Sequence, residues 1–255
     1  MRFFRLSVAL LFASSLLTLP AAAETLRLCF ENKDARPWRT AEGDGLDFTL
    51  LREVAQRLDL QIDFQALPWK RCLAMLQANQ VDGAFSVSYS PARARMAAFP
   101  GAARVDESKR MHIASYFLVR KKGSDLRWDG QHISNQQGPI GYQLGYSVGD
   151  FLRDQKVPTQ ELNMPAVDII RKLLGRQLGG AAVFGSDVES LTKGPLSEQF
   201  EILQPPLVSK PYYLVLSHAL VAARPQRAEQ IWSAVEAART SAEFTRLRFK
   251  GGGAD

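Results

Sequence analysis

Cysteine and histidine are scarce in this 255-residue sequence, which contains two cysteines and three histidines. The histidines lie far apart in the chain, and neither cysteine has a histidine close to it. The sequence therefore lacks the clustered ligands of a zinc site and the ordinary residues of nucleophilic catalysis. The zinc-protease pattern His-Glu-x-x-His and the phosphate-loop pattern Gly-x-x-x-x-Gly-Lys-Ser/Thr are also absent. We expect no metal, no cofactor and no enzymatic activity.

A strong excess of one charge is missing as well. The 32 basic and 26 acidic residues give a formal net charge of +6, and the basic residues are scattered apart from a short run at residues 120–122. Aromatic and basic residues do not alternate along any segment, as they would in a track that binds nucleic acid. We therefore expect no nucleic acid partner.

Long uncharged runs are confined to the start of the chain. Arg2 and Arg5 precede 14 uncharged residues at 6–19, and three alanines follow at 21–23. A basic start, a short apolar middle and an Ala-x-Ala end are typical of a secretory signal peptide, and the run is too short to span a bilayer. We predict that residues 1–23 are a cleaved signal peptide and that the mature protein is periplasmic. An N-terminal core helix is the alternative.

The two cysteines, Cys29 and Cys72, both remain after this cleavage. In an oxidising compartment two thiols tend to form a disulfide when their geometry allows it. Cys29 lies in a strand-like segment and Cys72 in a helix-like one, so two buried free thiols are the alternative.

Strand-like and helix-like segments alternate along the first half of the mature chain. Residues 25–30 and 62–66 have strand patterns, whereas apolar residues recur at helical spacing in 47–58 and in 69–76. Trp69 lies on the apolar face of the second helix, and we assign it mainly to packing, with contact to the binding pocket as the alternative. A third strand follows at 81–87. This alternation predicts an α/β fold in which helices flank a mostly parallel sheet.

The second half of the chain repeats this organisation. A polar stretch at 121–138 precedes strand-like segments at 140–143 and 181–184, with a helix from Ala166 between them. A last strand is expected at 212–217, before C-terminal helices. We predict two lobes joined by a two-segment hinge. The predicted divisions are lobe 1 at 24–118, lobe 2 at 119–208, a crossover with C-terminal helices returning to lobe 1 at 209–250, and a flexible tail at 251–255.

Two segments of the first half carry a resemblance to a known family. Gly45-Leu46-Asp47-Phe48 begins the first long helix, and residues 81–93 read VDGAFSVSYSPAR, with Phe99-Pro100 shortly after them. This order and spacing resemble the periplasmic solute-binding proteins of amino-acid ABC transporters, the bacterial extracellular solute-binding proteins of family 3. The resemblance implies the type II periplasmic-binding-protein fold, whose two lobes close on a small-molecule ligand.

The resemblance also implies a carboxylate site around Arg93. In this family the arginine of a Thr-x-x-Arg motif binds the α-carboxylate of the ligand, and Arg93 is the matching residue here. A guanidinium suits this role because it is planar, stays charged and can donate two parallel hydrogen bonds to a carboxylate. Ser86 and Ser88 are implied to donate hydrogen bonds to the same carboxylate. The alternative is that Arg93 is an ordinary surface charge.

Aromatic and glycine-containing segments supply further predicted contacts. Trp38 matches a family position beside the ligand, and a place in the core of lobe 1 is its alternative. In lobe 2, Tyr142, Gly145, Tyr146 and Ser147 match a loop that leads into a helix whose N-terminus faces the cleft. Exposed N–H groups at such a terminus attract anions. Helix capping is the alternative for Ser147.

The sequence departs from the family pattern where the ligand's ammonium group is expected. The family places an aspartate directly after a strand of lobe 2, but Ser186 occupies that position here and Asp187 follows it. We predict that Asp187 contacts the ammonium group through a one-residue shift; otherwise the ligand lacks that group. At the end of the first strand, where the family often has an acidic residue, this chain has Asn32 beside Glu31.

Together these features predict a monomeric periplasmic protein that binds an amino acid or a related carboxylate by hinge closure. Its expected partner is the membrane permease of an ABC transporter, and a membrane receptor served by a ligand-sensing module is the alternative. Some proteins of this fold are dehydratases of the cyclohexadienyl type, which act on prephenate-like acids. In that alternative, Glu31 or Glu189 would act as the general acid.

Overall fold

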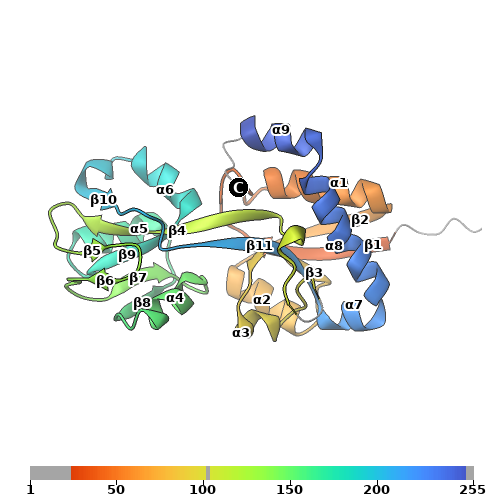
Figure 1. Cartoon of the computed structure of the whole chain (residues 1–255), viewed down its shortest axis with the longest axis horizontal. Coiled ribbons are helices and arrows are strands. Elements are labelled where there is room, and N and C mark those ends of the chain that lie inside the picture. Colours follow the sequence, from red (N-terminus) through yellow and green to blue (C-terminus); the bar gives the residue numbers. More distant parts are fainter. Residues whose placement is uncertain (1–23, 102–103, 251–255) are drawn as a thin grey trace, which may run out of the picture.

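The computed structural model describes residues 24–101 and 104–250. The predicted signal peptide at 1–23 and the predicted tail at 251–255 lie outside the described residues. The described chain forms two α/β lobes joined by two long strands (Figure 1). Among its helices, none combines the length and the apolar character that crossing a membrane requires. The two-lobed α/β architecture expected from the alternating pattern is confirmed.

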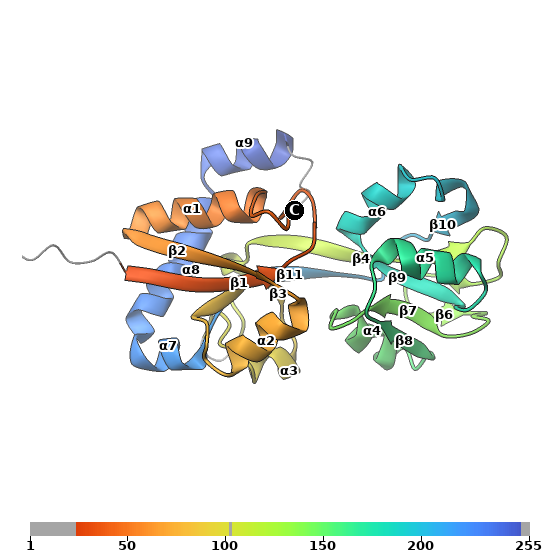
Figure 2. The same cartoon turned by 180° about the vertical axis from the view of Figure 1, so that it is seen from behind.

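The first lobe contains a parallel sheet covered by helices on both faces. Strand β1 pairs with β2 on one side and with β3 on the other, in parallel throughout. Figure 2 shows helix α1 above these strands and helix α2 below them. The elements of this lobe are β1 (Glu24–Glu31), α1 (Leu46–Leu58), β2 (Leu60–Leu67), α2 (Trp69–Gln77), β3 (Gly83–Ser88), α3 (Pro91–Ala94), η1 (Glu107–Lys109), α7 (His218–Ala223), α8 (Pro225–Arg239) and α9 (Ala242–Lys250).

The second lobe is smaller and is built on the same plan. Strand β7 pairs in parallel with β8 and with β9, and helix α5 packs its apolar face against these strands. A two-stranded ribbon, β5 with β6, occupies part of the polar stretch at 121–138. The elements are β5 (Arg127–Trp128), β6 (Ile133–Ser134), β7 (Ile140–Gln143), α4 (Val148–Asp154), β8 (Thr159–Leu162), α5 (Ala166–Leu174), β9 (Gly180–Phe184), α6 (Gly185–Thr192), η2 (Ser197–Gln199) and β10 (Phe200–Ile202).

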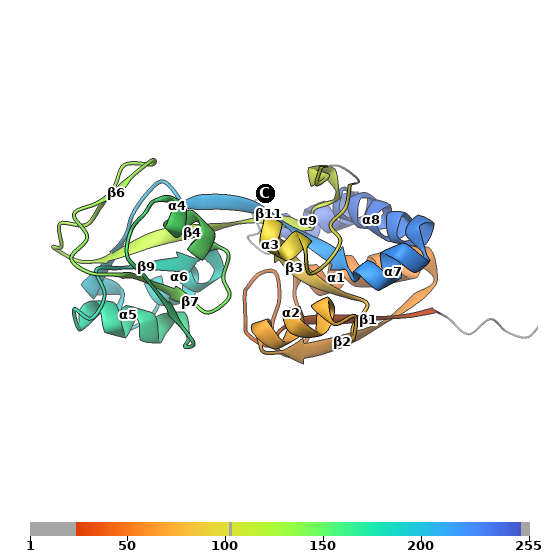
Figure 3. The ribbon, with the colours of Figure 1, turned by 90° about the horizontal axis from the view of Figure 1, so that it is seen from below.

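The hinge consists of β4 (His112–Lys121) and β11 (Val208–Leu216), which run side by side between the lobes (Figure 3). They pair antiparallel to each other, β11 also pairs with β3, and β4 also pairs with β9. A single sheet in the order β2-β1-β3-β11-β4-β9-β7-β8 therefore passes through both lobes. The two-segment hinge is confirmed, whereas the lobe boundaries at residues 118–119 and 208–209 stay predictions.

The second crossing strand begins earlier than its sequence pattern indicates. The predicted start was residue 212, but β11 starts at Val208. Ser209, Lys210 and Pro211 break the apolar alternation that marks a strand, and they become extended because they pair with β4. Pairing with the backbone of β4 therefore decided where β11 begins. The local sequence pattern carries no information about such pairing.

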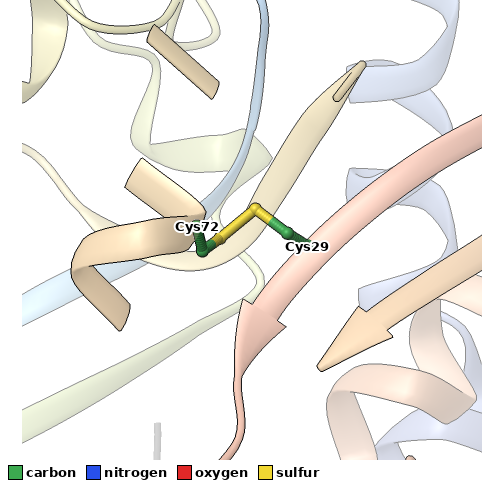
Figure 4. The surroundings of a disulfide bond; sticks show 2 residues. All are labelled: Cys29 and Cys72. Carbon is green, nitrogen blue, oxygen red and sulfur yellow. A yellow bond between two sulfur atoms is a disulfide. The ribbon is translucent and has the colours of Figure 1, made fainter. Parts of the chain in front are cut away.

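A disulfide joins Cys29 of β1 to Cys72 of α2 (Figure 4). The predicted bond is thus present, and the alternative of two free thiols is wrong. Both cysteines are fully buried, and the bond closes a loop between positions that are 43 residues apart. By loop-closure entropy, a bond of this span stabilises the folded chain by about 4 kcal/mol. It also anchors α2, the helix that begins with Trp69.

Candidate ligand-binding site

A cavity lies between the two lobes, beside the crossing strands. It holds about 410 Å³ of empty space, including its opening to solvent. Aromatic rings make up most of its wall, and charged side chains from the first lobe interrupt them. The lining residues are Glu31, Arg39, Trp69, Phe85, Ser86, Arg93, Tyr116, Tyr146, Phe184 and Tyr212. Its composition, a largely aromatic wall with a few charged groups, matches that of small-molecule sites in proteins.

Arg93 is held in the wall of this cavity by the short helix α3. Ser90 caps that helix by accepting a hydrogen bond from the Arg93 backbone N–H, and Pro91 occupies the first helical position. The Arg93 side chain is buried, and its guanidinium lies 5.6 Å from the centre of the Trp69 ring. The alternative that Arg93 is an ordinary surface charge is therefore wrong.

The hydrogen bonds of Arg93 reach both lobes. Nη1 donates to the hydroxyl of Ser88 at 2.7 Å and to its carbonyl at 3.1 Å, and Nη2 donates to the carbonyl of Gly145 at 3.0 Å. Within residues 24–101 and 104–250, no carboxylate forms an ion pair with Arg93. A desolvated guanidinium with neutral partners alone favours the arrival of an anion.

Ser86 belongs to a buried polar chain behind the cavity. Its backbone has a positive φ of 57°, and its hydroxyl donates to Asp47. The other carboxylate oxygen of Asp47 lies 2.9 Å from Nδ1 of His112. A residue other than glycine is strained at positive φ, and this chain holds Ser86 in that conformation at the cavity wall.

Trp38 lies in a layer behind the cavity and is not part of its wall. Its ring stacks on His112 at 4.1 Å, and His112 stacks at 5.2 Å on Tyr212, which does line the cavity. Trp38 also belongs to the hydrophobic core of lobe 1, which was its alternative role. Gly45 makes this packing possible, because a Cβ atom there would lie 2.5 Å from the Trp38 carbonyl oxygen.

The predicted loop of lobe 2 lies against the first lobe. Gly145, with a φ of 79°, packs so closely on Trp69 that a Cβ atom would come within 3.1 Å of the indole. The Ser147 hydroxyl accepts a hydrogen bond from Ser88 at 2.9 Å and makes no capping bond to helix α4. The alternative that Ser147 serves to cap this helix is therefore wrong.

A second, wider space adjoins the cavity. Tyr142, Gly145 and Ser147 line this outer space, whereas Arg93 and Tyr146 line both. The predicted loop thus contributes one side chain, Tyr146, to the aromatic cavity itself.

A buried ion pair occupies the wall formed by the first lobe. Glu31 is 4% exposed and Arg39 is 6% exposed, and Nη2 of Arg39 donates to Oε2 of Glu31 at 2.6 Å. The Tyr146 hydroxyl of the second lobe donates to the same oxygen at 3.0 Å. Burial, together with the charge of Glu31, raises the pKa of Tyr146 well above its ordinary value, so its hydroxyl stays a donor.

Asp187 lies in the first turn of helix α6, within electrostatic reach of this pair. Burial, reinforced by the charge of Glu31, raises the pKa of Asp187 to about 6. Asp187 does not line the cavity in this closed arrangement, and the hydroxyl of the preceding Ser186 is buried without a partner. Its contact with a ligand ammonium stays a prediction.

A family model of bacterial extracellular solute-binding proteins, family 3, matches residues 32–248. The chain belongs to this family. No curated protein matches this solute-binding protein in sequence. Many solved structures have the same fold. The sequence identity of the three given below is so low that it shows the fold alone.

Three of these structures illustrate the range of the fold. The substrate-binding protein of an amino acid ABC transporter is 15% identical over 89% of this chain and 98% of its own, with a TM-score of 0.66. A histidine kinase sensor domain is 14% identical over 90% and 96%, with a TM-score of 0.72. An ancestral amino-acid-binding protein, a precursor of cyclohexadienyl dehydratase, is 14% identical over 89% and 94%, with a TM-score of 0.65.

One segment of this solute-binding protein also matches a catalytic pattern. Residues 145–149 read Gly-Tyr-Ser-Val-Gly, the Gly-x-Ser-x-Gly pattern of serine hydrolases, and they follow a strand and precede a helix. However, Ser147 has helical angles of −71° and −5°, and its hydroxyl is bonded to Ser88, not to an imidazole. The match therefore lacks the base that activates a serine nucleophile.

Sequence reasoning missed much of the cavity wall of this solute-binding protein. It assigned Trp69 mainly to packing, and it did not select Phe85, Arg39 or the rings of the crossing strands. A usable signal existed for Phe184, because it is the last residue of the parallel strand β9 and ligands bind at the carboxyl ends of such strands in α/β folds. Phe85 lies inside β3 and carries no such signal. Arg39 carries no comparable signal, since it follows an irregular loop.

Proposed function

We propose that this protein binds an amino acid in the interlobe cavity and does not alter it chemically. The observation that carries the proposal is Arg93, a buried guanidinium in the cavity wall that has neutral partners alone. The ligand α-carboxylate supplies the missing negative charge and replaces the carbonyl and hydroxyl partners. Ser86 lines the same side of the cavity. Ser88 lies behind Arg93 and must release Ser147 before its hydroxyl can donate to the ligand. Asp187 receives the ammonium group.

Closure of the two lobes completes the site. Three hydrogen bonds already cross the cleft: Ser88 to Ser147, Arg93 to Gly145 and Tyr146 to Glu31. All three join polar groups that face water when the lobes separate, so they add little stability by themselves. A ligand that touches both lobes shifts the population toward this closed form, with β4 and β11 as the hinge.

The test is a calorimetric titration of the mature protein with the standard amino acids, followed by the Arg93→Ala variant. A ligand that binds only the folded protein also raises its melting temperature, which gives a second readout. We expect Arg93→Ala to weaken binding about 100-fold or more, because a buried charge pair is broken. Arg95→Ala is the matched control, since Arg95 is exposed on the same turn. Normal binding by Arg93→Ala would refute the site.

We further propose that the closed, ligand-bound protein delivers its ligand to the permease of an ABC transporter in the periplasm. Family membership supports this role. The test is ATP hydrolysis by an amino-acid ABC transporter reconstituted in vesicles, which liganded protein should stimulate more than ligand-free protein. Binding to a receptor ectodomain without stimulation would instead favour the sensing role, whose fold a histidine kinase sensor domain shares.

One observation favours a catalytic alternative. With its pKa raised to about 6, Asp187 is suited to act as a general acid near neutral pH, and a precursor of cyclohexadienyl dehydratase shares the fold. Glu189 is less suited, because it is exposed and its hydrogen bond with Lys193 lowers its pKa. We expect prephenate to be recovered unchanged after incubation. Conversion that disappears in Asp187→Asn would establish the enzyme instead.

A further inference from the structure

Arg39 is a second arginine in the cavity wall, and its donors are only partly used. Its side chain is almost completely buried, and its hydrogen bond to Glu31 occupies Nη2. The Nε–H group of the same guanidinium is buried and has no partner. Because buried polar groups in folded proteins are nearly always hydrogen-bonded, an unpaired donor on a residue that lines a ligand cavity points to a partner in the ligand.

Glu31, the acidic residue of this wall, is by contrast already paired with cations of the protein. Its Oε2 accepts from Arg39 at 2.6 Å and from Tyr146 at 3.0 Å, and Lys33 lies 3.8 Å from Oε1. The carboxylate is therefore neutralised by the protein's own cations before any ligand arrives. A ligand side chain that ends in a cation would lie against the positively charged guanidinium of Arg39, which repels it. Glu31 is already paired with Arg39 and is not available to neutralise that cation.

We propose that Arg39 forms a subsite for an oxygen acceptor on the ligand side chain, a carboxamide or a carboxylate, and that this subsite excludes basic amino acids. This inference rests on the proposed function, because it takes Arg93 as the partner of the α-carboxylate. Because Glu31 cancels the charge of Arg39, the subsite offers hydrogen-bond donors without a net positive charge, so an uncharged carboxamide is bound more tightly than a carboxylate, whose desolvation is costlier. Aromatic rings, among them Phe85 and Tyr116, line the remaining wall and pack on the methylene groups of the side chain.

The experiment compares five ligands by calorimetric titration: glutamine, glutamate, norleucine, lysine and arginine. Norleucine has an apolar side chain of similar length and no acceptor. We expect glutamine to bind at least about tenfold more tightly than norleucine, a ratio that one charge-assisted hydrogen bond accounts for. Glutamate should lie between them, and lysine and arginine should not bind measurably. A basic amino acid as the tightest ligand overturns the inference.

The variant Arg39→Met tests the residue itself. It keeps a long apolar side chain but removes every donor, and it should abolish the preference for glutamine over norleucine. An unchanged preference overturns the inference. Because Arg39→Met leaves Glu31 buried without its partner, the double variant Glu31→Gln/Arg39→Met serves if the single variant does not fold. The matched control is Glu53→Gln/Arg57→Met, which removes an exposed ion pair of the same 2.6 Å length.

Failure of this inference is distinct from failure of the proposed function. If amino acids bind and Arg93→Ala abolishes binding, but acceptors give no advantage, the Arg39 subsite alone is wrong. If no amino acid binds, or if binding survives Arg93→Ala, the proposed function itself is wrong.

Discussion

The two lobes contribute different chemistry to the cavity. The first lobe supplies buried charges, namely Arg93, Arg39 and Glu31, on elements that a disulfide and a long helical cover hold in place. The second lobe contributes uncharged side chains, Tyr146 and Phe184, to the wall of the cavity, and its own charged groups lie outside that wall. Under the proposed function, we expect the ligand to dock first on the charged groups of the first lobe and the second lobe then to close over it.

Removal of the disulfide in the first lobe has the largest expected effect, a loss of stability. Replacing both cysteines, as in Cys29→Ala/Cys72→Ala, should lower the free energy of unfolding by about 4 kcal/mol, because the unfolded chain gains the freedom of the closed loop. Urea denaturation measures this loss. Ligand affinity should fall as well, since the bond anchors α2 and hence Trp69. Unchanged stability would mean that packing alone holds α2 on the first lobe.

Acidification has the second-largest expected effect, a loss of ligand affinity through protonation of Asp187 in the second lobe. Asp187 must be ionised to bind an ammonium group, and burial with the nearby charge of Glu31 raises its pKa to about 6 in the closed arrangement. As pH falls from 7 to 5, the ionised fraction drops roughly tenfold, so affinity for a zwitterionic ligand should fall by about the same factor. Binding shifts the equilibrium toward the ionised form, so it should release a proton near pH 5.

The control for this pH dependence is Asp187→Asn. Calorimetric titration of that variant should show weaker binding at pH 7 and an almost flat profile between pH 5 and pH 7. A profile as steep as that of the unmodified protein would assign the titration to another group and would remove Asp187 from the ammonium site.

Removal of the Tyr146 hydroxyl at the cleft has the smallest expected effect on ligand affinity. Tyr146→Phe deletes the bond to Glu31 across the lobes but keeps the ring in the cavity. Because this bond exists only in the closed form, its loss should weaken ligand binding about fivefold, mostly through faster dissociation. Stopped-flow kinetics would measure it. An effect as large as that of Arg93→Ala would contradict the view that the first lobe holds most of the binding energy.

Much of the fold is readable from local pattern. The apolar residues of α1, such as Leu50, Leu51 and Val54, recur at helical spacing and are buried against α8 in the core of lobe 1. Arg93 was found through the family resemblance, whose short motif ends at this residue, and the structure adds that Ser90 caps the helix that carries it. Such features depend on residues close together in the chain, so sequence reasoning reaches them.

The positions of Glu31, Arg39 and Trp38 could not be read in this way. Local alternation did not decide whether Asn32 or Glu31 faces the cleft, and the structure places Glu31 in the cavity wall. Arg39 meets Glu31 because the loop after β1 folds back, and Trp38 stacks on His112 from a hinge strand more than 70 residues away. The sequence by itself determined the two lobes and the order of strands and helices, and its resemblance to the family singled out Arg93, for which we propose a carboxylate partner. Only the tertiary structure decided which charges neutralise one another in the cavity, because ion pairing depends on distances between segments that no local pattern contains.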